Sequence, residues 1–450
     1  MRQPLIRLGA NELTYEIRGI VKKAEQIENL GYTILWENIG DPVQKNCKLP
    51  DWMTDIIAGL AKNNAAYSYC HSKGIPATRQ FLADRNNNLK GAQITADDIL
   101  FFNGLGDAIA KVYQFLEPTA RIIGPSPAYS THSSAEGAHA NTKPITYKLD
   151  PENFWYPDVE DLYLKVKYNP NIVGILIINP DNPTGMVYPR EILESIVAIA
   201  DEFKLFLISD EIYINVTYNG AEAFPLAQVI GDKVPGIGLK GISKELPWPG
   251  SRCGWSEFYN RKIDPEFDKL CTALENAKMI EVCSTKFPQM AIPLIMGDAR
   301  YQPYRNNLNE HIGKRSKIIA EILKPVPQIT FNETYGAFYN TIVFKPGTLS
   351  KDQYLQVEDE RIELILSQWL NEPMALDKQF VLNLLAAKKV CVVPISSFCS
   401  ELQGFRVTLL EENEEILVDT FTRIRDGLIE YFESDKSVAQ TKTDLKKAIS

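Results

Sequence analysis

The stretch 172–178, Ile-Val-Gly-Ile-Leu-Ile-Ile, constrains the fold more than any other segment of the chain. A near-continuous apolar run without alternation predicts a strand that is buried on both faces, as in parallel sheets. Short apolar runs also lie at 99–102 and 205–208, and the segment 189–203 has the apolar spacing of a helix. This strand–helix–strand order predicts an α/β fold with a mostly parallel sheet covered by helices on both sides.

The pattern changes after about residue 305. Charged helical stretches then alternate with short apolar segments such as 336–339 and 405–408, which we expect to be strands. Residues 15–30 also have helical spacing. We therefore predict a large domain over 46–305 and a smaller α+β domain made of 1–45 together with 306–450, whose polar tail 434–450 is expected to fray.

Charge and cysteine usage exclude several classes of protein. The chain has 48 basic and 57 acidic residues, a net charge of −9, which disfavours binding to nucleic acid or to a membrane surface. The seven cysteines form no C-x-x-C pair and no metal-ligand spacing, so we expect reduced thiols, no metal site and a cytoplasmic location. The N-terminus has no apolar run, and we predict neither a signal peptide nor a membrane span.

Lys244 is the centre of the chemically informative residues. Arg252 follows it by eight positions, Asp210 ends the apolar run at 205–208, and Asn-Pro-Asp-Asn-Pro-Thr-Gly occupies 179–185. A single lysine is ordinarily a solvated surface residue. Together, however, these pieces supply what pyridoxal 5′-phosphate requires: an amine for a Schiff base, a carboxylate for the pyridine nitrogen, and a guanidinium for the phosphate.

Three further side chains complete the expected contacts to the cofactor ring. Asp210, which alone could be a helix N-cap, would form an ion pair with the pyridine nitrogen worth roughly 4 kcal/mol at about 4 Å and an effective dielectric near 20. Tyr213 could be a core tyrosine and Asn182 a turn residue. The alternative is that both donate hydrogen bonds to the phenolic oxygen of the cofactor.

The phosphate would bind where a helix begins. The turn Gly104-Leu105-Gly106 separates an apolar run from a helical segment, so the N–H groups of Leu105 and Gly106 would face an anion beside Arg252. Asp107 would repel that anion unless it turns away to cap the helix.

Tyr129, His132 and Arg406 are further candidates. Tyr129 could stack on the pyridine ring, and His132 could hydrogen-bond to Asp210, although a single histidine is more often a packed or surface residue. Arg406 lies in a short apolar strand, where an arginine is costly unless it is paired. A substrate α-carboxylate would be a suitable partner, and a buried salt bridge is the alternative.

These motifs resemble those of fold-type I, class I/II aminotransferases, and the resemblance extends over nearly the whole chain. It implies a large domain with a seven-stranded-type, mostly parallel sheet sandwiched by helices, a smaller α+β domain, and a homodimer with a shared active site. It also implies that Lys244 moves a proton during catalysis. Further roles implied are catalytic for Asp210 and Tyr213, cofactor-binding for Leu105, Gly106, Tyr129, His132, Asn182, Ser243 and Arg252, and substrate-binding for Gly40, Asn182 and Arg406.

The resemblance further implies that Tyr69, five residues before Gly74, reaches the phosphate of the partner subunit. The segments 15–19 and 69–74 and Gly241 are most similar to alanine (glutamate–pyruvate) transaminases. The sequence departs from the family pattern at 247–249, 346–378 and 394–398, which affects the expected pocket for the substrate side chain.

The leading hypothesis is therefore a ping-pong aminotransferase that moves an amino group between an L-amino acid and a 2-oxo acid, of alanine/glutamate type. One alternative keeps the cofactor in a β-lyase or an enzyme like aspartate β-decarboxylase. A remote alternative is a ligand-sensing regulator built on the same fold, which would need a DNA-binding domain before residue 15.

Overall fold

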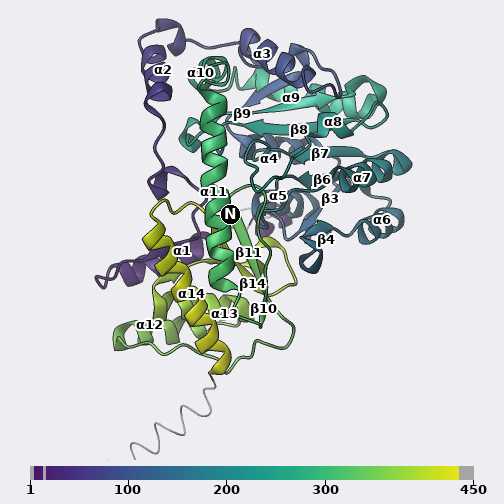
Figure 1. Ribbon diagram of the computed structural model, residues 1–450. Coiled ribbons are helices and arrows are strands. Elements are labelled where there is room, and N and C mark those ends of the chain that lie inside the picture. The colour runs from purple at the N-terminus through teal and green to yellow at the C-terminus, as the bar shows by residue number, and fades with distance from the viewer. Residues whose placement is uncertain (1–4, 14–16, 435–450) are drawn as a thin grey trace, which may run out of the picture. The chain divides into compact units, whose positions relative to one another are not determined.

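The computed structural model describes residues 5–13 and 17–434, and of residues 17 and 18 only the backbone (Figure 1). The chain forms two compact units. Unit 1 contains Met1–Thr14, Asp41–Gly313 and Tyr335–Ala337, and unit 2 contains Tyr15–Gly40, Lys314–Thr334 and Phe338–Ser450. The division into 46–305 and 1–45 with 306–450 stays a prediction. Of the tail expected to fray, 434–450, all residues except Ser434 lie outside the described part of the chain.

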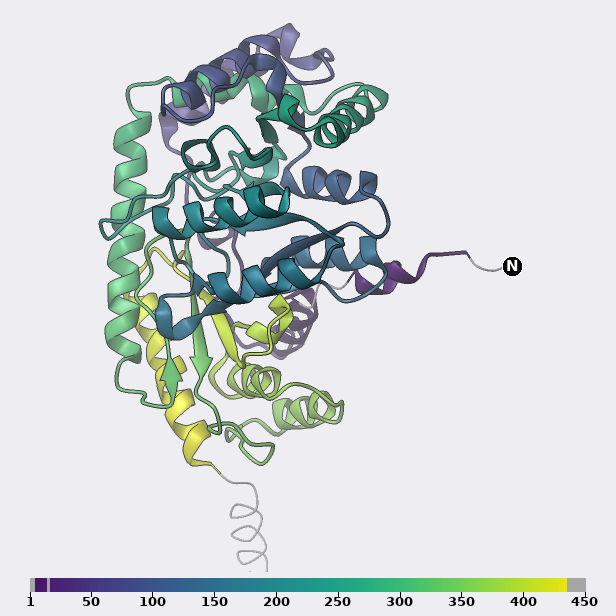
Figure 2. The ribbon, with the colours of Figure 1, turned by 90° about the vertical axis from the view of Figure 1, so that its right-hand side faces the viewer.

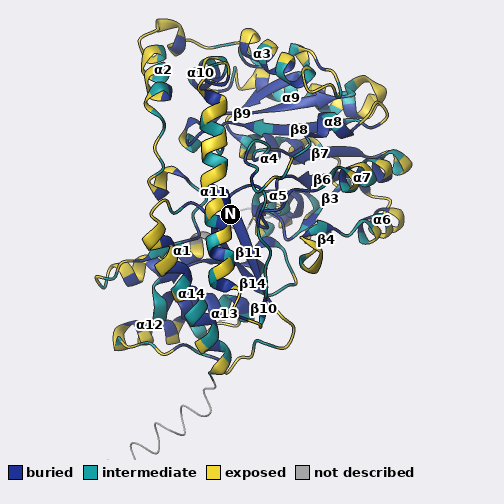
Figure 3. Ribbon diagram, in the orientation of Figure 1, coloured by how far each residue is buried: buried dark blue, intermediate teal, exposed yellow. Residues whose placement is uncertain are grey.

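An eight-stranded sheet is the centre of unit 1, and its strands are almost entirely buried (Figure 3). In spatial order the strands are β2 (Ile99–Phe102), β9 (Gly254–Tyr259), β8 (Gly236–Gly241), β7 (Phe206–Asp210), β6 (Ile172–Ile178), β3 (Arg121–Ser126), β4 (Thr146–Asp150) and β5 (Tyr156–Pro157).

The run of five strands from β8 to β4 is parallel, while β9 and β5 are antiparallel to their neighbours. The predicted fold class is thus confirmed. Its eighth strand is the two-residue β5, which is too short to give a sequence signal.

Helices cover both faces of this sheet. On one face, α4 (Leu105–Phe115) and α9 (Pro265–Ile280) pack on alternate strand residues such as Leu176, Ile208 and Leu239. On the other face, α7 (Arg190–Phe203) packs on β7 and on α6 (Val159–Tyr168), and both helices face the viewer in Figure 2. The remaining helices of unit 1 are α2 (Asp51–Ala61), α3 (Pro76–Asn87), α5 (Ser130–Ala140), α8 (Leu226–Val229) and α10 (Lys286–Met296), and α11 (Tyr301–Leu323) starts in unit 1 and continues into unit 2.

Unit 2 is a small α+β structure. Its antiparallel sheet has the order β10 (Ile329–Thr330), β11 (Tyr339–Phe344), β14 (Gly404–Thr408) and β13 (Val393–Pro394), and β1 (Leu35–Trp36) pairs in parallel with β12 (Val390–Cys391). Its helices are α1 (Ile17–Glu28), α12 (Glu360–Leu370), α13 (Leu376–Lys388) and α14 (Glu414–Glu433). The Phe380 ring of α13 contacts Phe405 of β14 and Tyr431 of α14, at centroid distances of 5.5 and 5.1 Å, so aromatic packing joins sheet and helices.

One predicted strand is wrong. Residues 336–338 precede β11, which begins only at Tyr339. A Cβ atom on Gly336 would lie 2.6 Å from both Pro180 and Val187, so this glycine lets the backbone pass close to the 179–187 loop instead of joining a sheet. None of the helices among the described residues is long and apolar enough to cross a membrane.

Candidate active site

The candidate site lies at the carboxyl edge of the parallel strands. β3, β6, β7 and β8 are neighbours and run in the same direction, so the loops that follow them meet at one edge of the sheet. Register places Ile178, Asp210 and Leu239 side by side. The loops after these four strands carry Tyr129, Asn182, Tyr213 and Lys244, and the structure therefore brings the sequence-predicted cofactor residues of unit 1 to a common edge.

Asp210 and His132 form a buried pair. His132 Nε2 lies 2.9 Å from Asp210 Oδ2, and the backbone N–H of Ile212 donates to Asp210 Oδ1 over 3.1 Å. The two side chains are 2% and 5% exposed. The hydrogen bond expected from the sequence is present, because His132 lies in the first turn of α5 and faces the end of β7. Such a partner fixes the orientation of the carboxylate.

Lys244 lies in the turn that follows β8. Its Nζ is 5.9 Å from the centroid of the Tyr213 ring, and Ser243 before it is buried. The lysine itself is half-buried. The amine and the tyrosine that the sequence places in one site are thus close neighbours.

Asn182 lies in a rigid loop that Asp181 organises. The Asp181 carboxylate accepts hydrogen bonds from the N–H and the hydroxyl of Thr184 at 3.0 and 2.5 Å, and its backbone N–H donates to Met186 O. Burial raises the pKa of Asp181 to about 7, against the hydrogen bonds from Thr184. No local sequence pattern marks Asp181 as important. The feature that marks it is its complete burial, which only the structure shows.

The anion end of the site is formed by α4 and by Arg252. Gly104, the N-cap of α4, has φ +84°, and a Cβ there would lie 2.3 Å from Arg252 Nη2. Arg252 therefore lies against the start of the helix, where N–H groups of Leu105 and Gly106 have no intrahelical acceptor. Register explains the proximity, because Phe102 and Gly241 both pair with Gly254.

Asp107 does not oppose an anion at this place. Its Oδ2 accepts a hydrogen bond from the N–H of Asn103 and lies 3.1 Å from Nζ of the buried Lys278, while Lys111 contacts the other oxygen at 2.9 Å. Burial alone would raise the pKa of Asp107, but the lysines and the Asn103 N–H lower it below its usual value. The carboxylate thus turns back to Asn103, which precedes the helix, and to two lysines; it does not cap an N–H group of α4, as the sequence had suggested.

Arg406 and Gly40 both lie in unit 2. Arg406 is 3% exposed, donates from Nη2 to Asn38 O over 2.6 Å, and its guanidinium carbon is 4.4 Å from the Tyr339 ring centroid. A Cβ on Gly40 would collide with the Tyr339 hydroxyl at 2.0 Å, so Gly40, Tyr339 and Arg406 are packed together. The buried side-chain amide of Asn38 has no hydrogen-bond partner within the described chain, and the sequence analysis missed it.

Tyr69, in contrast, is 79% exposed in this chain. Its expected position on a partner subunit's phosphate stays a prediction. Across the described ranges, no group of three or more His, Cys, Asp or Glu side chains could hold a metal ion.

The residues present at the sheet edge fit pyridoxal 5′-phosphate. An arginine held against a glycine-capped helix start suits a phosphate. The Ser251 hydroxyl next to that arginine is buried without a partner in the described structure, and so is His132 Nδ1 beside the carboxylate. Unsatisfied buried polar atoms of this kind are typical of ligand sites.

Comparisons with known proteins agree with this geometry. The chain matches the family model "Aminotransferase class I and II" over residues 33–420. It is 51% identical over 434 residues to an uncharacterized aminotransferase of Methanocaldococcus jannaschii, covering 96% of this chain and 100% of the relative. It is 30% identical over 334 residues to glutamate-pyruvate aminotransferase AlaA of Escherichia coli K12, covering 72% and 79%.

A solved structure, the alanine aminotransferase from Pyrococcus furiosus, superposes with a TM-score of 0.81 at 27% identity, over 95% of this chain and all of that one. Members of this family use pyridoxal 5′-phosphate. The chain belongs to the class I and II aminotransferases and is a pyridoxal 5′-phosphate-dependent enzyme of fold type I.

Proposed function

We propose that this enzyme transfers an amino group between L-alanine and 2-oxoglutarate, or between close analogues of both, by a ping-pong mechanism. The names of two relatives support this substrate pair, glutamate-pyruvate aminotransferase and alanine aminotransferase. The observation that carries the proposal is the carboxyl edge of the large sheet, where the buried Asp210–His132 pair, Lys244 beside Tyr213, and Arg252 against Gly104 meet.

The bound cofactor supplies the electron sink for the reaction, and the residues around it set its charge and position. Asp210 would provide a negative charge for the pyridine nitrogen, and His132 keeps that carboxylate in one orientation. Asn182 and Tyr213 would donate hydrogen bonds to the phenolic oxygen, and Tyr129 would stack on the ring. The residues that would bind the phosphate are Leu105, Gly106, Ser243 and Arg252.

Lys244 is the catalytic base in this proposal. Its Nζ would take the proton from the substrate Cα and hold it. In the second half of the proton transfer, the same Nζ would give the proton back. The Tyr213 ring beside Nζ limits the positions that the lysine occupies.

Arg406 would bind the α-carboxylate of both substrates. The guanidinium carbon lies 4.4 Å from the centroid of the Tyr339 ring and 5.0 Å from that of the Phe398 ring, so both rings position the group. A planar fork of this kind binds a carboxylate through two parallel hydrogen bonds. Gly40 and the side-chain amide of Asn38 would line the same subsite.

Single-turnover experiments test the proposal. Purified holoenzyme mixed with L-alanine without acceptor should release one pyruvate per active site and change the cofactor absorbance once. Adding 2-oxoglutarate should restore the spectrum and form one glutamate. Absence of both changes with alanine, glutamate and aspartate would refute it. Repeated pyruvate release from β-substituted substrates without an acceptor would instead indicate a lyase.

Lys244 can be tested by reduction with sodium borohydride followed by peptide mapping. The cofactor should remain attached to the peptide that contains Lys244. A label on any other lysine contradicts the assignment.

We also propose that the enzyme is a cytoplasmic homodimer. The seven cysteines, all among the described residues, form no disulfide bond, which supports a reducing compartment. The exposed apolar residues Tyr67, Tyr69, Met279, Ile280 and Val282 support association. Light scattering at micromolar concentration should give twice the chain mass of 50.8 kDa, and cell fractionation should recover the activity in the cytosol.

A further inference from the structure

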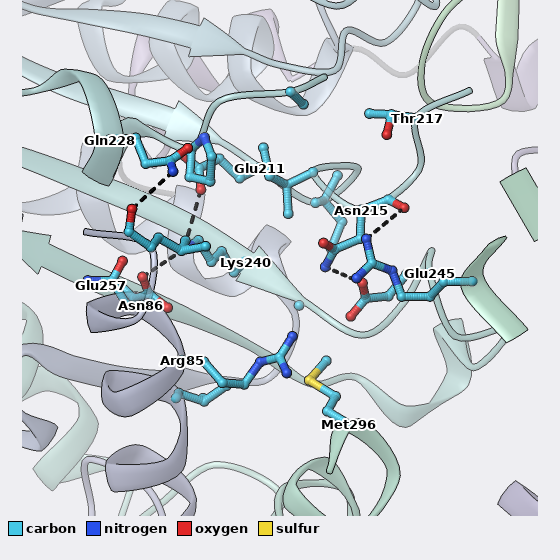
Figure 4. Close-up of a pocket in the computed structure, with 18 of the residues that line it drawn as sticks. Arg85, Asn86, Glu211, Asn215, Thr217, Gln228, Lys240, Glu245, Glu257 and Met296 are labelled. Carbon is cyan, nitrogen blue, oxygen red and sulfur yellow. Dashed lines mark hydrogen bonds and ion pairs between the residues drawn. The ribbon is translucent and has the colours of Figure 1, made fainter. Parts of the chain in front are cut away.

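Unit 1 contains a second cavity, of about 400 Å³, on the β7–β8–β9 part of the sheet (Figure 4). It is lined by side chains of α3, by the segment after Tyr213, by the last residue of α10 and by the first turns of α11. The lining includes Glu245 and Ile212 but none of Asp210, Tyr213, Asn182 or Lys244. It is therefore a different space from the candidate active site.

The most buried cation of this cavity already has partners. Lys240 Nζ lies 2.8 Å from Glu257 Oε2 and 3.5 Å from Glu211 Oε2. Burial works to lower the pKa of Lys240, but the two glutamates outweigh it and raise the pKa. This closed cluster occupies one end of the cavity in Figure 4 and is not available to an anionic ligand.

Two arginines of the cavity wall have no such partner. Within the described chain, neither Arg85 nor Arg305 forms an ion pair with a carboxylate. Both guanidiniums lie by the same Tyr301 ring, at 5.8 and 5.5 Å from its centroid, which positions them without neutralising them. Arg305 Nη2 donates to Asn215 O over 3.4 Å, whereas its Nε is buried without an acceptor.

Positive charges that line a concave surface without a carboxylate partner favour binding of an anion. In Figure 4 the guanidinium of Arg85 extends toward the open centre of the cavity, and no dashed line reaches it. A carboxylate could accept forked hydrogen bonds from such a group.

The cavity also presents acceptors for a donor group. Asn86 is 2% exposed; its Nδ2 donates to Ala92 O, and its Oδ1 has no donor in the described chain. The Glu245 carboxylate lies on the opposite wall, where one oxygen accepts a hydrogen bond from Asn215 Nδ2. An ammonium group at one of these walls would satisfy the acceptor there, which an anion alone cannot do.

The remaining wall is apolar. Leu82 of α3, Leu89 just after that helix, Ile212 and Met296 line the cavity. Its volume is in the range of small-molecule sites. A ligand that fits must combine a carboxylate, an ammonium and an apolar side chain.

We propose that this cavity is a second binding site, for a free L-amino acid with an apolar side chain, separate from the site of amino transfer. The segments that form its walls are continuous with the catalytic residues, since Glu245 follows Lys244 and Ile212 precedes Tyr213. Occupancy of the cavity therefore changes the environment of both residues, and by linkage any effect on substrate affinity is reciprocal.

Equilibrium dialysis of radiolabelled L-leucine tests the proposal. The holoenzyme is first reduced with borohydride, so that its active site cannot react with the amino acid. We expect saturable binding of leucine that becomes about tenfold weaker in Arg85→Gln and in Arg305→Gln, because each loses a charged hydrogen bond. Arg361→Gln, which changes an exposed arginine of unit 2, is the matched control and should bind as the wild type does.

Two analogues of leucine test the contributions of its carboxylate and its ammonium group separately. 4-Methylpentanoate lacks the ammonium and 3-methylbutylamine lacks the carboxylate, and both should compete at least tenfold more weakly than leucine. The proposal is overturned if no leucine binds, if both arginine variants bind it normally, or if 4-methylpentanoate or inorganic phosphate competes as well as leucine. Unchanged cofactor absorbance and melting temperature show that the variants are folded. Loss of transamination in the wild type with retained leucine binding would refute only the proposed activity.

Discussion

At the scale of single residues, the charge of Asp210 is the property that the proposed chemistry needs most. Asp210→Asn keeps the size of the side chain and an acceptor for the Ile212 N–H, but removes the negative charge. Loss of an ion pair worth roughly 4 kcal/mol would slow the reaction by about a thousandfold. We expect this decrease in the single-turnover rate with L-alanine.

Asp201→Asn is the control for this substitution. Asp201 lies on α7 and pairs with Lys204 at the surface, so the rate should stay within a factor of two or so of the wild type. A fast Asp210→Asn variant would show that the carboxylate does not act on the cofactor ring.

Asp181 predicts a pH dependence of stability. Its pKa of about 7 in the folded chain exceeds the ordinary value of 3.8 because the carboxyl is buried. The folded state then binds the proton more tightly than the unfolded state, so stability is lost as pH rises from about 4 to 7. The shift, 7 − 3.8, is about 3 units, or on the order of 4 kcal/mol over that window.

Asp181→Asn should remove this dependence, because an amide oxygen can still accept from Thr184 and does not titrate. The melting temperature of the variant relative to that of the wild type should therefore increase between pH 5 and 8. Measured by differential scanning calorimetry, this increase should be a few degrees. Parallel melting curves across this range would mean that Asp181 is ionised in the folded protein throughout.

Local patterns in the sequence locate residues whose chemistry follows from spacing. Asp210 at the end of an apolar run and His132 three residues after Tyr129 could be identified in this way, and the hydrogen bond between them is present. Asp181 and Asn38 could not be identified from the sequence. Both matter because they are buried and have polar atoms without a partner in the described chain, and these properties arise only when distant segments pack together. The same holds for Lys278, whose contact with Asp107 joins α9 to the start of α4.

At the scale of elements, the start of α4 is the most constrained part of the site. Gly104 has φ +84° and ψ 164°, a region almost restricted to glycine, and an added Cβ would displace Arg252. Gly104→Ala should therefore weaken cofactor binding by at least about tenfold, through strain and loss of a charged contact. Titration of cofactor-free protein with pyridoxal 5′-phosphate measures this.

Gly106→Ala is a matched control two residues away. A Cβ on Gly106 meets no atom within 4 Å, and the substitution keeps the backbone N–H. Its cofactor affinity should equal that of the wild type or exceed it slightly, since alanine favours the helix. Unchanged cofactor affinity in Gly104→Ala would argue that the helix start does not bind the phosphate.

Elements were predictable where a pattern was long or uniform. The run 172–178 coincides with β6, and the helical spacing over 189–203 differs from α7 by one residue. The expected strand at 205–208 is β7, Phe206–Asp210, which places Asp210 inside the strand. The predicted strand at 336–338 was wrong because contact with the 179–187 loop decides the conformation there. The pairing order of the strands could not be predicted from local patterns, since it depends on the whole sheet.

At the scale of the whole molecule, one surface of unit 1 is suited to a second copy of the chain. The exposed Tyr67 and Tyr69 adjoin the exposed residues 279–282, because Lys286 Nζ donates to Ser68 Oγ over 2.7 Å and the Cys70 N–H lies 3.5 Å from Cys283 Sγ. Exposed apolar side chains gathered in this way are typical of an interface between proteins. Tyr69, one of them, would then reach the neighbouring active site.

Subunit complementation tests this sharing of sites. Lys244→Ala lacks the proposed base, and Tyr69→Ala should lose about tenfold in activity for lack of one hydrogen bond to the phosphate. In a mixed dimer, the chain with an intact Lys244 receives its tyrosine from the other chain, so one of the two sites is complete. Equal mixtures, unfolded and refolded together, should therefore recover about a quarter of the wild-type activity, since half of the dimers are mixed. If the activity of the refolded mixture is no greater than the sum of the activities of the separate variants, each chain completes its own site. The same two variants mixed without refolding are the control.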